Sequence, residues 1–456
     1  MRLDQVSKRI GAGDVKLTNQ GQVVAYLPAA GNAGIYFYGE AIESQYTRDN
    51  VYWLQMAKGA RMPALAGTAA AAVALGNFPA QSHAEQNVTA VTGMFHDPAA
   101  DYWMWDYVVA GNAVYGTKSF TLTADGASPQ GPVSLTVHML GVTATGKGID
   151  HHVQIRLNGV LVGEARWAGA QPHTLNTAIE PSLLRDGANT LEVKAVLDAG
   201  VTYSIFYINS FDLSYMRAYQ ALNDALAFTS VNDQAVTVYG FGNSNVMLFD
   251  LSNPRLPKQV IGARVEAADG AYRVTFKPNA AGVPYLAVTT AATPRITTLK
   301  IDKPSALKST NGAQYLILTT TDLTAAAKGL ATYRQSQGLK SQVVDLQDIY
   351  DEFNGGVASP AAIQAFLAYA YQNWKPAPQY VLLAGAGSYD YKNYLGYGDS
   401  LAPPIMVDTG TGLAAGDGRY GDVVGNDGAP ELAVGRLPVL TAAELKSAIT
   451  KIRAYE

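Results

Sequence analysis

The 456-residue sequence contains no cysteine. This absence excludes disulfide bonds, thiolate metal ligands and a cysteine nucleophile within these residues, and it leaves the cellular compartment open. Histidine is scarce too, with six in the chain and none after His173. Charged residues make up only 15% of the chain, the net charge is −4, and no basic block occurs. Nucleic acid is therefore not an expected partner.

Long apolar runs are also missing. The longest weakly polar run, residues 62–75, is too short and too rich in alanine to cross a bilayer, so no transmembrane segment is expected. The first 17 residues lack the apolar core of a signal peptide. We therefore expect the chain to begin inside a longer gene product.

The residues that are abundant indicate a folded protein with many strands. Hydrophobic residues make up 48% of the chain, and there are 44 glycines and 27 tyrosines. The length predicts three or four domains. The expected fold class is multidomain β plus α/β, in four segments: a β-rich N-terminal region (1–112), a β-sandwich (113–217), a small Ig-like β spacer that opens with a short helix at 218–227 (218–303), and an α/β unit with a mostly parallel sheet (304–456).

Six strand candidates at short spacing predict the β-sandwich. They are residues 119–124, 133–140, 152–157, 160–167, 190–197 and 204–215. The pair Asn158-Gly159 predicts a two-residue hairpin turn between two of them. The stretch resembles the jelly-roll or galactose-binding-like carbohydrate-binding modules of secreted enzymes. The resemblance implies either a glycan held by loop aromatics, with Trp167 as the candidate contact, or a bracing role with Trp167 in the core.

Two further features of the β-rich part have competing interpretations. The aromatic run 101–107 (DYWMWDY) suits a stacking surface for sugar or peptide, or packing between domains, and packing is favoured because aromatic rings bury large areas where β layers meet. His151 and His152 are adjacent in a predicted strand, so their side chains point to opposite faces and form a poor chelate.

From residue 304 onward strands and helices alternate, which predicts a mostly parallel sheet with helices on its faces. Residues 315–319, 341–346, 379–385 and 432–436 are the expected strands. Asp322 is expected to cap one helix, the Ser359-Pro360 pair is expected to begin a second, and Thr441 opens a third with a capping box. In the second helix apolar residues recur at one face from Ile363 to Trp374.

The stretch 379–390 (QYVLLAGAGSYD) ends an apolar strand in glycines and small polar residues. Such a strand tip is typical of a parallel strand that opens onto a functional site. The common nucleotide-binding, zinc-protease and serine-hydrolase motifs are not found in the sequence.

An acidic, glycine-rich loop follows at 417–431. Its oxygen-bearing side chains are the candidate ligands of a calcium ion: Asp417, Asp422, Asn426, Asp427 and Glu431. The spacing is not that of an EF-hand, and an ordinary solvated turn with its corner at 426–428 is the other interpretation. Arg436, at a strand end, is expected to be a structural ion-pair partner.

Residues 315–391 and the closing run DGRYGDVVGNDGAPELAVGRLPVLTAAEL resemble the first half of a gingipain-type cysteine peptidase domain, peptidase family C25. The resemblance covers about 150 residues in the right order. It implies a caspase-like fold, a protein or peptide substrate, and an extracellular or cell-surface location. It also implies a catalytic His/Cys dyad in the second half of the domain.

The sequence departs from the pattern of this family at two points. No cysteine or later histidine is present, so catalytic residues are expected beyond Glu456 and this chain is predicted to be inactive alone. Ala386 stands where family members often carry aspartate. The alternative interpretation is a non-catalytic glycan-binding or surface-assembly protein that uses the peptidase-like fold as a scaffold.

Overall fold

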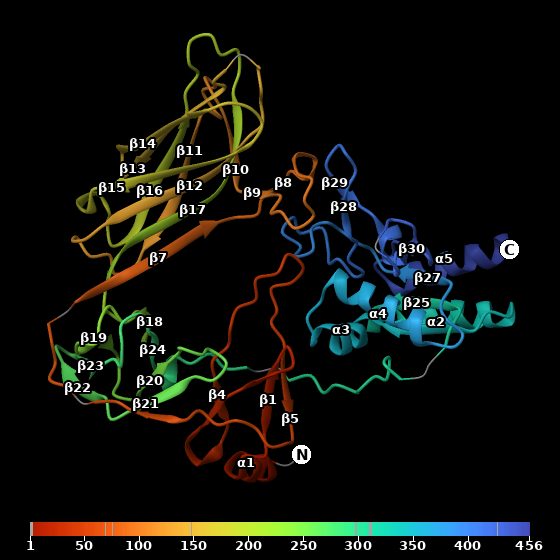
Figure 1. Cartoon of the computed structure of the whole chain (residues 1–456), viewed down its shortest axis with the longest axis horizontal. Helices are drawn as coiled ribbons and strands as arrows, with labels where there is room; N and C mark the ends of the chain where they lie inside the picture. The colour runs from red at the N-terminus through yellow and green to blue at the C-terminus, as the bar shows by residue number, and fades with distance from the viewer. Residues whose placement is uncertain are drawn as a thin grey trace.

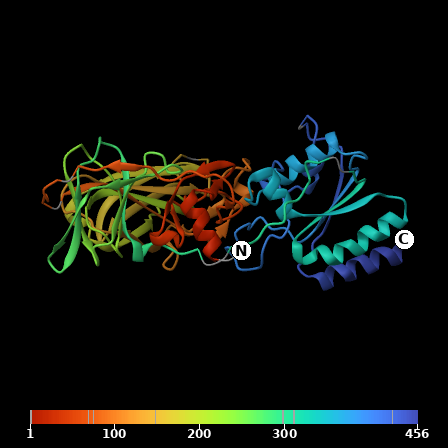
Figure 2. The ribbon, with the colours of Figure 1, turned by 90° about the horizontal axis from the view of Figure 1, so that it is seen from below.

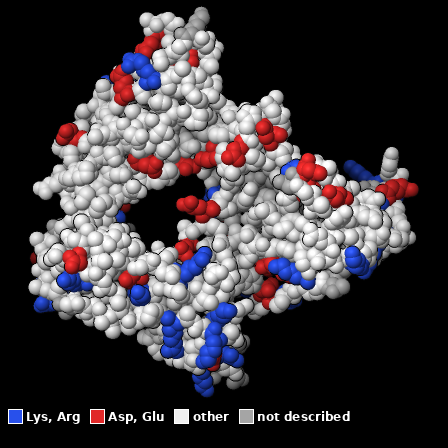
Figure 3. All heavy atoms as spheres, in the orientation of Figure 1, with Lys and Arg blue, Asp and Glu red and all other residues white. Residues whose placement is uncertain are grey.

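The computed structural model describes residues 3–68, 70–74, 76–146, 148–296, 299–309, 312–425 and 427–456. They fold into three β-rich units and one α/β unit, which Figure 1 shows in order along the chain. Figure 3 shows these units around an opening, with acidic and basic side chains dispersed over the visible face. The predicted fold class, β modules followed by an α/β unit with a parallel sheet, is confirmed.

The N-terminal unit combines one helix with small antiparallel sheets. Its elements are α1 (Leu3–Ala12), β1 (Lys16–Asn19), β2 (Gln22–Val24), β3 (Tyr26–Pro28), the 3-10 helix η1 (Ala30–Asn32), β4 (Ile35–Phe37) and β5 (Tyr52–Gln55). Strands β2, β1 and β5 form one sheet, and β3 pairs with β4. The connection 38–51 contains neither helix nor strand. The next strand, β6 (Ala64–Ala66), leaves this unit and pairs in parallel with β21 (Lys258–Ile261).

The second unit is the predicted β-sandwich, with a core between its two sheets. One sheet contains β7 (Asn77–Glu85), β10 (Asp106–Val109), β17 (Ile205–Ala218), β12 (Val133–Gly141) and β15 (Pro172–Ile179). The other contains β11 (Thr117–Ala124), β16 (Gly187–Ala195), β13 (His151–Leu157) and β14 (Val160–Trp167), and η3 (Pro181–Leu183) lies between β15 and β16.

All six predicted strands of the sandwich are present, whereas β15 was not predicted. This edge strand alternates between exposed and half-buried side chains until Ile179, its last residue, which is buried, so the apolar signal in its sequence is weak. Strands β7 and β10, from before residue 113, both pair with β17, so this sheet extends into the segment expected as the N-terminal region. The domain boundaries at 112, 217 and 303 stay predictions. Trp167 is 5% exposed in the core, which confirms the core interpretation of its role.

The third unit is a smaller two-sheet β structure. Its strands are β18 (Ala225–Thr229), β19 (Val236–Phe241), β20 (Val246–Asp250), β21, β22 (Arg264–Ala268), β23 (Ala271–Phe276) and β24 (Pro284–Thr289), followed by η4 (Thr290–Ala292). The helix predicted at 218–227 is wrong. Asn223 and Asp224 adopt φ values of 51° and 63°, which make a left-handed turn between β17 and β18 instead.

The fourth unit has four parallel strands in the order β26-β25-β27-β30. Its elements are β25 (Tyr315–Thr319), α2 (Thr321–Ser336), β26 (Ser341–Asp345), α3 (Leu346–Asn354), α4 (Pro360–Asn373), β27 (Tyr380–Ala384), β28 (Met406–Asp408), β29 (Leu413–Ala415), η5 (Asp417–Gly421), β30 (Ala433–Leu437) and α5 (Ala442–Tyr455). The caps predicted at Ser359 and Thr441 are confirmed: the Ser359 hydroxyl accepts the amide of Ala361, and Thr441 and Glu444 form the capping box. The cap predicted at Asp322 is wrong, because α2 begins at Thr321 and its N-cap is Thr320.

Two apolar layers hold the helices to this sheet. Successive residues of a strand point to opposite faces, so Ile317 of β25 packs with α2 and α5, while Leu316 and Leu318 pack with α3 and α4. Figure 2 shows α2 and α5 side by side along one face of the sheet. The sheet is therefore covered on both faces, as a parallel sheet requires. Among the described residues no helix combines the length and apolar composition needed to span a bilayer.

Candidate functional site

The candidate site lies at the carboxyl ends of the parallel strands. In open α/β sheets this edge is where functional loops gather. The Thr319 hydroxyl at the end of β25 donates to the carbonyl of Ala384 at the end of β27, at 2.6 Å. The Thr321 hydroxyl donates to the carboxylate of Asp345 at the end of β26, at 2.5 Å. Short polar side chains thus tie three neighbouring strand tips together.

The segment after β27 is held by Arg436 of β30. The Arg436 Nη1 donates to the carbonyls of Gly385 and Ala402, at 2.8 and 2.7 Å. Its Nε and Nη2 donate to the two carboxylate oxygens of Asp417, at 2.6 and 2.7 Å. A guanidinium that makes four such hydrogen bonds holds backbone in place, so the predicted role of Arg436 as a structural ion-pair partner is confirmed.

Gly387 shows how tightly this segment is packed. A Cβ atom at this position would lie 2.7 Å from the carbonyl oxygen of Ala402 and 2.8 Å from the Arg436 Nη1. Glycine is needed because backbone and guanidinium approach so closely. The neighbouring Ala386, the predicted point of divergence, contributes backbone bonds only: its amide donates to Val439, and its carbonyl accepts from Ala402.

The loop at 388–395 then turns around a buried carboxylate. Asp390 is 4% exposed, and its two oxygens accept the amides of Tyr394 and Leu395, at 2.8 and 2.7 Å. The hydroxyl of Tyr391 donates to the carbonyl of Pro404. Burial raises the pKa of Tyr391 far above its ordinary value, so its hydroxyl stays a donor.

The aromatic run 101–107 packs between units. Tyr102 and Trp103 lie in a buried cluster with Met406 and Leu413 of the hairpin formed by β28 and β29. The packing interpretation of this run is thus confirmed for these two residues. Figure 1 shows the short strands β8 (Thr89–Ala90) and β9 (Trp103–Met104) beside β28 and β29, and η2 (Thr92–Met94) follows β8.

Several carboxylates of the acidic loop accept hydrogen bonds from donors within the protein. Asp417 binds Arg436, Glu431 accepts the amides of Val423 and Val424, and Asp427 accepts the amide of Ala429. Asp422 accepts Arg419 and the amide of Gly428 through Oδ2, while its buried Oδ1 has no hydrogen-bond partner among the described residues.

These contacts do not by themselves assemble a calcium ligand set. Within the part of the chain that the structure describes, no three His, Cys, Asp or Glu side chains gather where they could hold a metal. Asn426, the fifth predicted ligand, lies outside the described residues. Calcium binding here stays a prediction, and the orphaned Oδ1 of Asp422 is the one observation that supports it.

The histidines lie in the β-rich units. His151 is fully buried and contacts the hydroxyl of Ser204, and His152 contacts Asp198 at 2.7 Å. His96 was not singled out by the sequence, yet its Nδ1 lies 2.8 Å from the carboxylate of Asp408 in the α/β unit. Nothing local could have predicted this pair, because 312 residues separate its members.

Helix α3 borders the same edge of the sheet and carries a perturbed carboxyl. Asp348 has its pKa raised to about 6, first by burial and then by the nearby carboxylates of Asp345 and Asp351. The helix itself was not predicted as a separate element. Its N-cap, Asp345, is also the last residue of β26, so no loop separates the strand from the helix.

Comparison with known proteins finds a family whose pattern the α/β unit matches. Residues 308–456 match peptidase family C25. The match covers the parallel sheet, the strand tips and the acidic loop, and it confirms the resemblance seen in the sequence. The matched segment is the C-terminal third of the chain. A search of curated proteins found no match.

The whole chain also shares its fold with a solved structure. Dimeric latent PorU from Porphyromonas gingivalis is 17% identical, with a TM-score of 0.65, over 99% of this chain and 48% of that one. This chain thus spans about half the length of that protein. Two further structures were found. One is a protease, which is 23% identical with a TM-score of 0.24 over 31% of this chain and 28% of that one. The other is a family 36 carbohydrate-binding module in complex with calcium and xylotriose, which is 16% identical with a TM-score of 0.18 over 28% of this chain and 99% of that one. At TM-scores this low, neither structure is evidence of a shared fold.

Proposed function

We propose that this chain is the N-terminal part of a secreted or cell-surface gingipain-like cysteine endopeptidase. The observation that carries the proposal is the match of residues 308–456 to peptidase family C25, together with the PorU-like fold of the whole chain. The substrate is a protein or peptide. The first half of a caspase-like domain supplies the strand tips, and the His/Cys dyad comes from residues beyond Glu456.

The chemistry follows from the dyad of such an enzyme. The imidazole takes the thiol proton, the thiolate attacks the scissile carbonyl, and an acyl-enzyme forms as the amine leaves with a proton from the imidazolium. Water then releases the acid. The described residues have a scaffolding part in this scheme: Arg436, Gly387 and Asp390 fix the backbone that follows β27.

Extending the reading frame tests the proposal. A chain that continues through a histidine and a cysteine should cleave peptides, and a thiol alkylator should abolish the cleavage. Residues 1–456 alone are the matched control, because they contain no thiol and should show no alkylator-sensitive activity. An extended chain with no cysteine within about two hundred further residues would contradict the peptidase proposal. This span follows from ordinary domain size.

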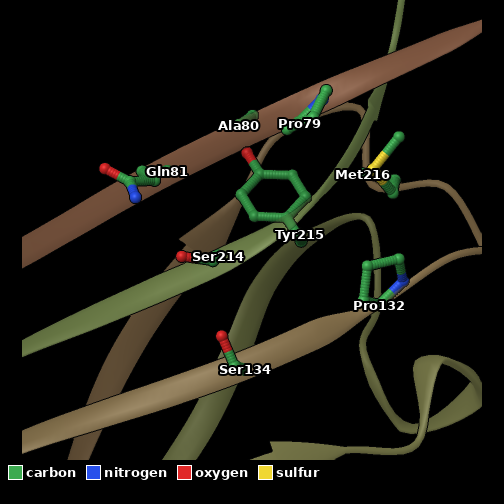
Figure 4. A pocket seen from close by; sticks show the side chains of 8 residues that line it. All are labelled: Pro79, Ala80, Gln81, Pro132, Ser134, Ser214, Tyr215 and Met216. Atoms are coloured by element: carbon green, nitrogen blue, oxygen red, sulfur yellow. The ribbon is translucent and has the colours of Figure 1, made fainter.

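A second candidate function is glycan binding by the sandwich, and it rests on one feature of its outer sheet face. A cleft of about 420 Å³ opens there, between strands β7, β12 and β17. Gln81, Ser134 and Ser214 reach it from these three strands, with Pro79, Pro132 and Met216 at one end (Figure 4). Hydroxyl and amide groups beside apolar rings suit a sugar.

Binding of a glycan panel to the whole chain, followed by calorimetry, tests the second candidate. The double variant Gln81→Ala/Ser214→Ala should lower the affinity for a glycan that binds saturably by at least about tenfold, which corresponds to the loss of one or two hydrogen bonds. Thr190→Ala, on the other sheet, is the control and should bind normally. If no glycan binds, or if the double variant binds as the parent does, this cleft is not the site.

A further inference from the structure

One short aromatic segment reaches into two different units of the protein. Trp105 packs edge-on against Phe120 and Phe211 of the sandwich, with ring centroids 4.9 and 5.6 Å apart. Trp103, two residues earlier, packs edge-on against Tyr394 of the α/β unit, at 4.9 Å. The direction changes because β9 ends at Met104 and β10 begins at Asp106. The two tryptophans therefore join the sandwich to the loop that follows β27.

Tyr102 adds a polar contact to the same loop. Its hydroxyl donates to the carbonyl of Tyr389 at 2.8 Å. Tyr102 and Trp103 are 2% and 7% exposed, so water is excluded from both contacts. Burial also raises the pKa of Tyr102 far above its ordinary value, so the hydroxyl keeps its proton.

A second N-terminal segment covers the loop from another direction. Tyr46 packs edge-on against Tyr391, with centroids 4.8 Å apart, and the guanidinium of Arg48 lies 4.7 Å from the ring centroid of Tyr394. The Gln45 amide donates to the carbonyl of Ala99, at 2.7 Å, which ties this segment to the one that carries Trp103. Aromatic pairs and a cation over a ring each stabilise such a contact beyond the area they bury.

The loop at 389–395 is therefore held on two sides. Toward the α/β core, Asp390 accepts the amides of Tyr394 and Leu395, and Tyr391 donates to Pro404. Toward the N-terminal units, its rings and backbone are contacted by four side chains: Tyr46, Arg48, Tyr102 and Trp103. Beyond the loop, the backbones of Gly93 and Gly412 approach so closely that a Cβ at Gly412 would lie 2.4 Å from the Gly93 Cα.

We propose that Trp103 is a positioning residue: it fixes the loop 389–395, so that the N-terminal β units hold the loop that follows the tip of β27. The N-terminal units are then part of the site's scaffold rather than spacers. The consequence for peptide cleavage rests on the proposed function. The positioning itself does not, because it can be measured in a chain that cleaves nothing.

Hydrogen exchange of the whole chain 1–456, followed by mass spectrometry of its peptides, tests the proposal. Trp103→Ala should raise the exchange of the Tyr394 and Leu395 amides by about tenfold or more, because these amides exchange when the loop opens locally. Exchange in β25 and in the sandwich sheets should stay within about twofold of the parent. Trp103→Phe, which keeps an aromatic ring, should restore most of the protection.

Trp105→Leu is the matched control, since it alters the same run of sequence on its sandwich side. It should raise exchange in β11 and leave the loop 389–395 unchanged. If Trp103→Ala does not fold, Tyr102→Phe and Arg48→Ala decide instead, and each should raise loop exchange about threefold. The proposal is overturned if the loop stays protected in these variants, or if Trp105→Leu exposes it equally. A peptidase assay that fails leaves these results untouched.

Discussion

Arg436 and Asp417 form a bidentate ion pair, with Nε–Oδ2 and Nη2–Oδ1 distances of 2.6 and 2.7 Å, behind the strand tip of β27. The remaining Nη1 of the arginine binds the carbonyls of Gly385 and Ala402. The pair links the acidic loop, the segment after β27 and the 402–404 connection. One side chain therefore organises three separate pieces of backbone at the candidate site.

Replacing this arginine should weaken the α/β unit. Arg436→Gln leaves Asp417 without its partner and two carbonyls without a donor, and we expect a loss of about 2–3 kcal/mol in the free energy of unfolding, measured by urea titration. Arg264→Gln is the control, because Arg264 is about half exposed in its ion pair with Glu266, and this change should alter stability by less than about 0.5 kcal/mol. Equal losses in the two variants would contradict the organising role.

The close approach at Gly387 gives a second prediction. Gly387→Ala forces a Cβ against the Ala402 carbonyl and Arg436, so we expect a destabilisation of about 1–3 kcal/mol by thermal or urea unfolding. Gly435→Ala, in the adjacent strand β30, places its Cβ in open space and should be neutral within about 0.5 kcal/mol. A neutral Gly387→Ala would show that the segment relaxes.

Asp348 predicts a pH dependence of stability. Its pKa is raised from 3.8 to about 6, so the folded chain binds this proton more tightly than the unfolded chain. The contribution of Asp348 to stability therefore falls as the pH rises from about 4 to about 6, and then stays constant. Asp348→Asn should be more stable than the parent at pH 8, by about 1 kcal/mol after solvent screening, and equal to it below pH 4. A constant difference across the titration would contradict this cause.

Calcium gives a fourth prediction, from the loop 417–431. If the orphaned Oδ1 of Asp422 faces a cation, millimolar calcium should raise the melting temperature by several degrees over the value in a chelator, since a ligand of the folded state stabilises it. Asp422→Asn should remove this shift. Asp408→Asn, whose carboxylate lies with His96 instead, is the control and should keep it. An unchanged melting temperature in the parent would contradict calcium binding by the loop 417–431.

Local patterns predicted much of the fold. The six strands of the sandwich, the four parallel strands and the capping residues Ser359 and Thr441 all follow from alternation, helical periodicity and cap chemistry, which operate over a few residues. The predictions failed or were incomplete where contacts between residues far apart in sequence decide the local structure. The apolar residues at 218–227 suited a helix, yet they serve two strands joined by the left-handed turn at Asn223 and Asp224.

The sequence by itself determined the resemblance of the last 150 residues to peptidase family C25, the alternation of strands and helices there, and the absence of cysteine from this chain. Only the tertiary structure decided that the strand tip at 379–390 is held by Arg436 and covered by Trp103. These contacts join residues far apart in sequence, so no local spacing encodes them. Trp103 and Trp105 look alike in the sequence, and a bend between two short strands turns Trp103 to the loop after β27 and Trp105 to the sandwich core.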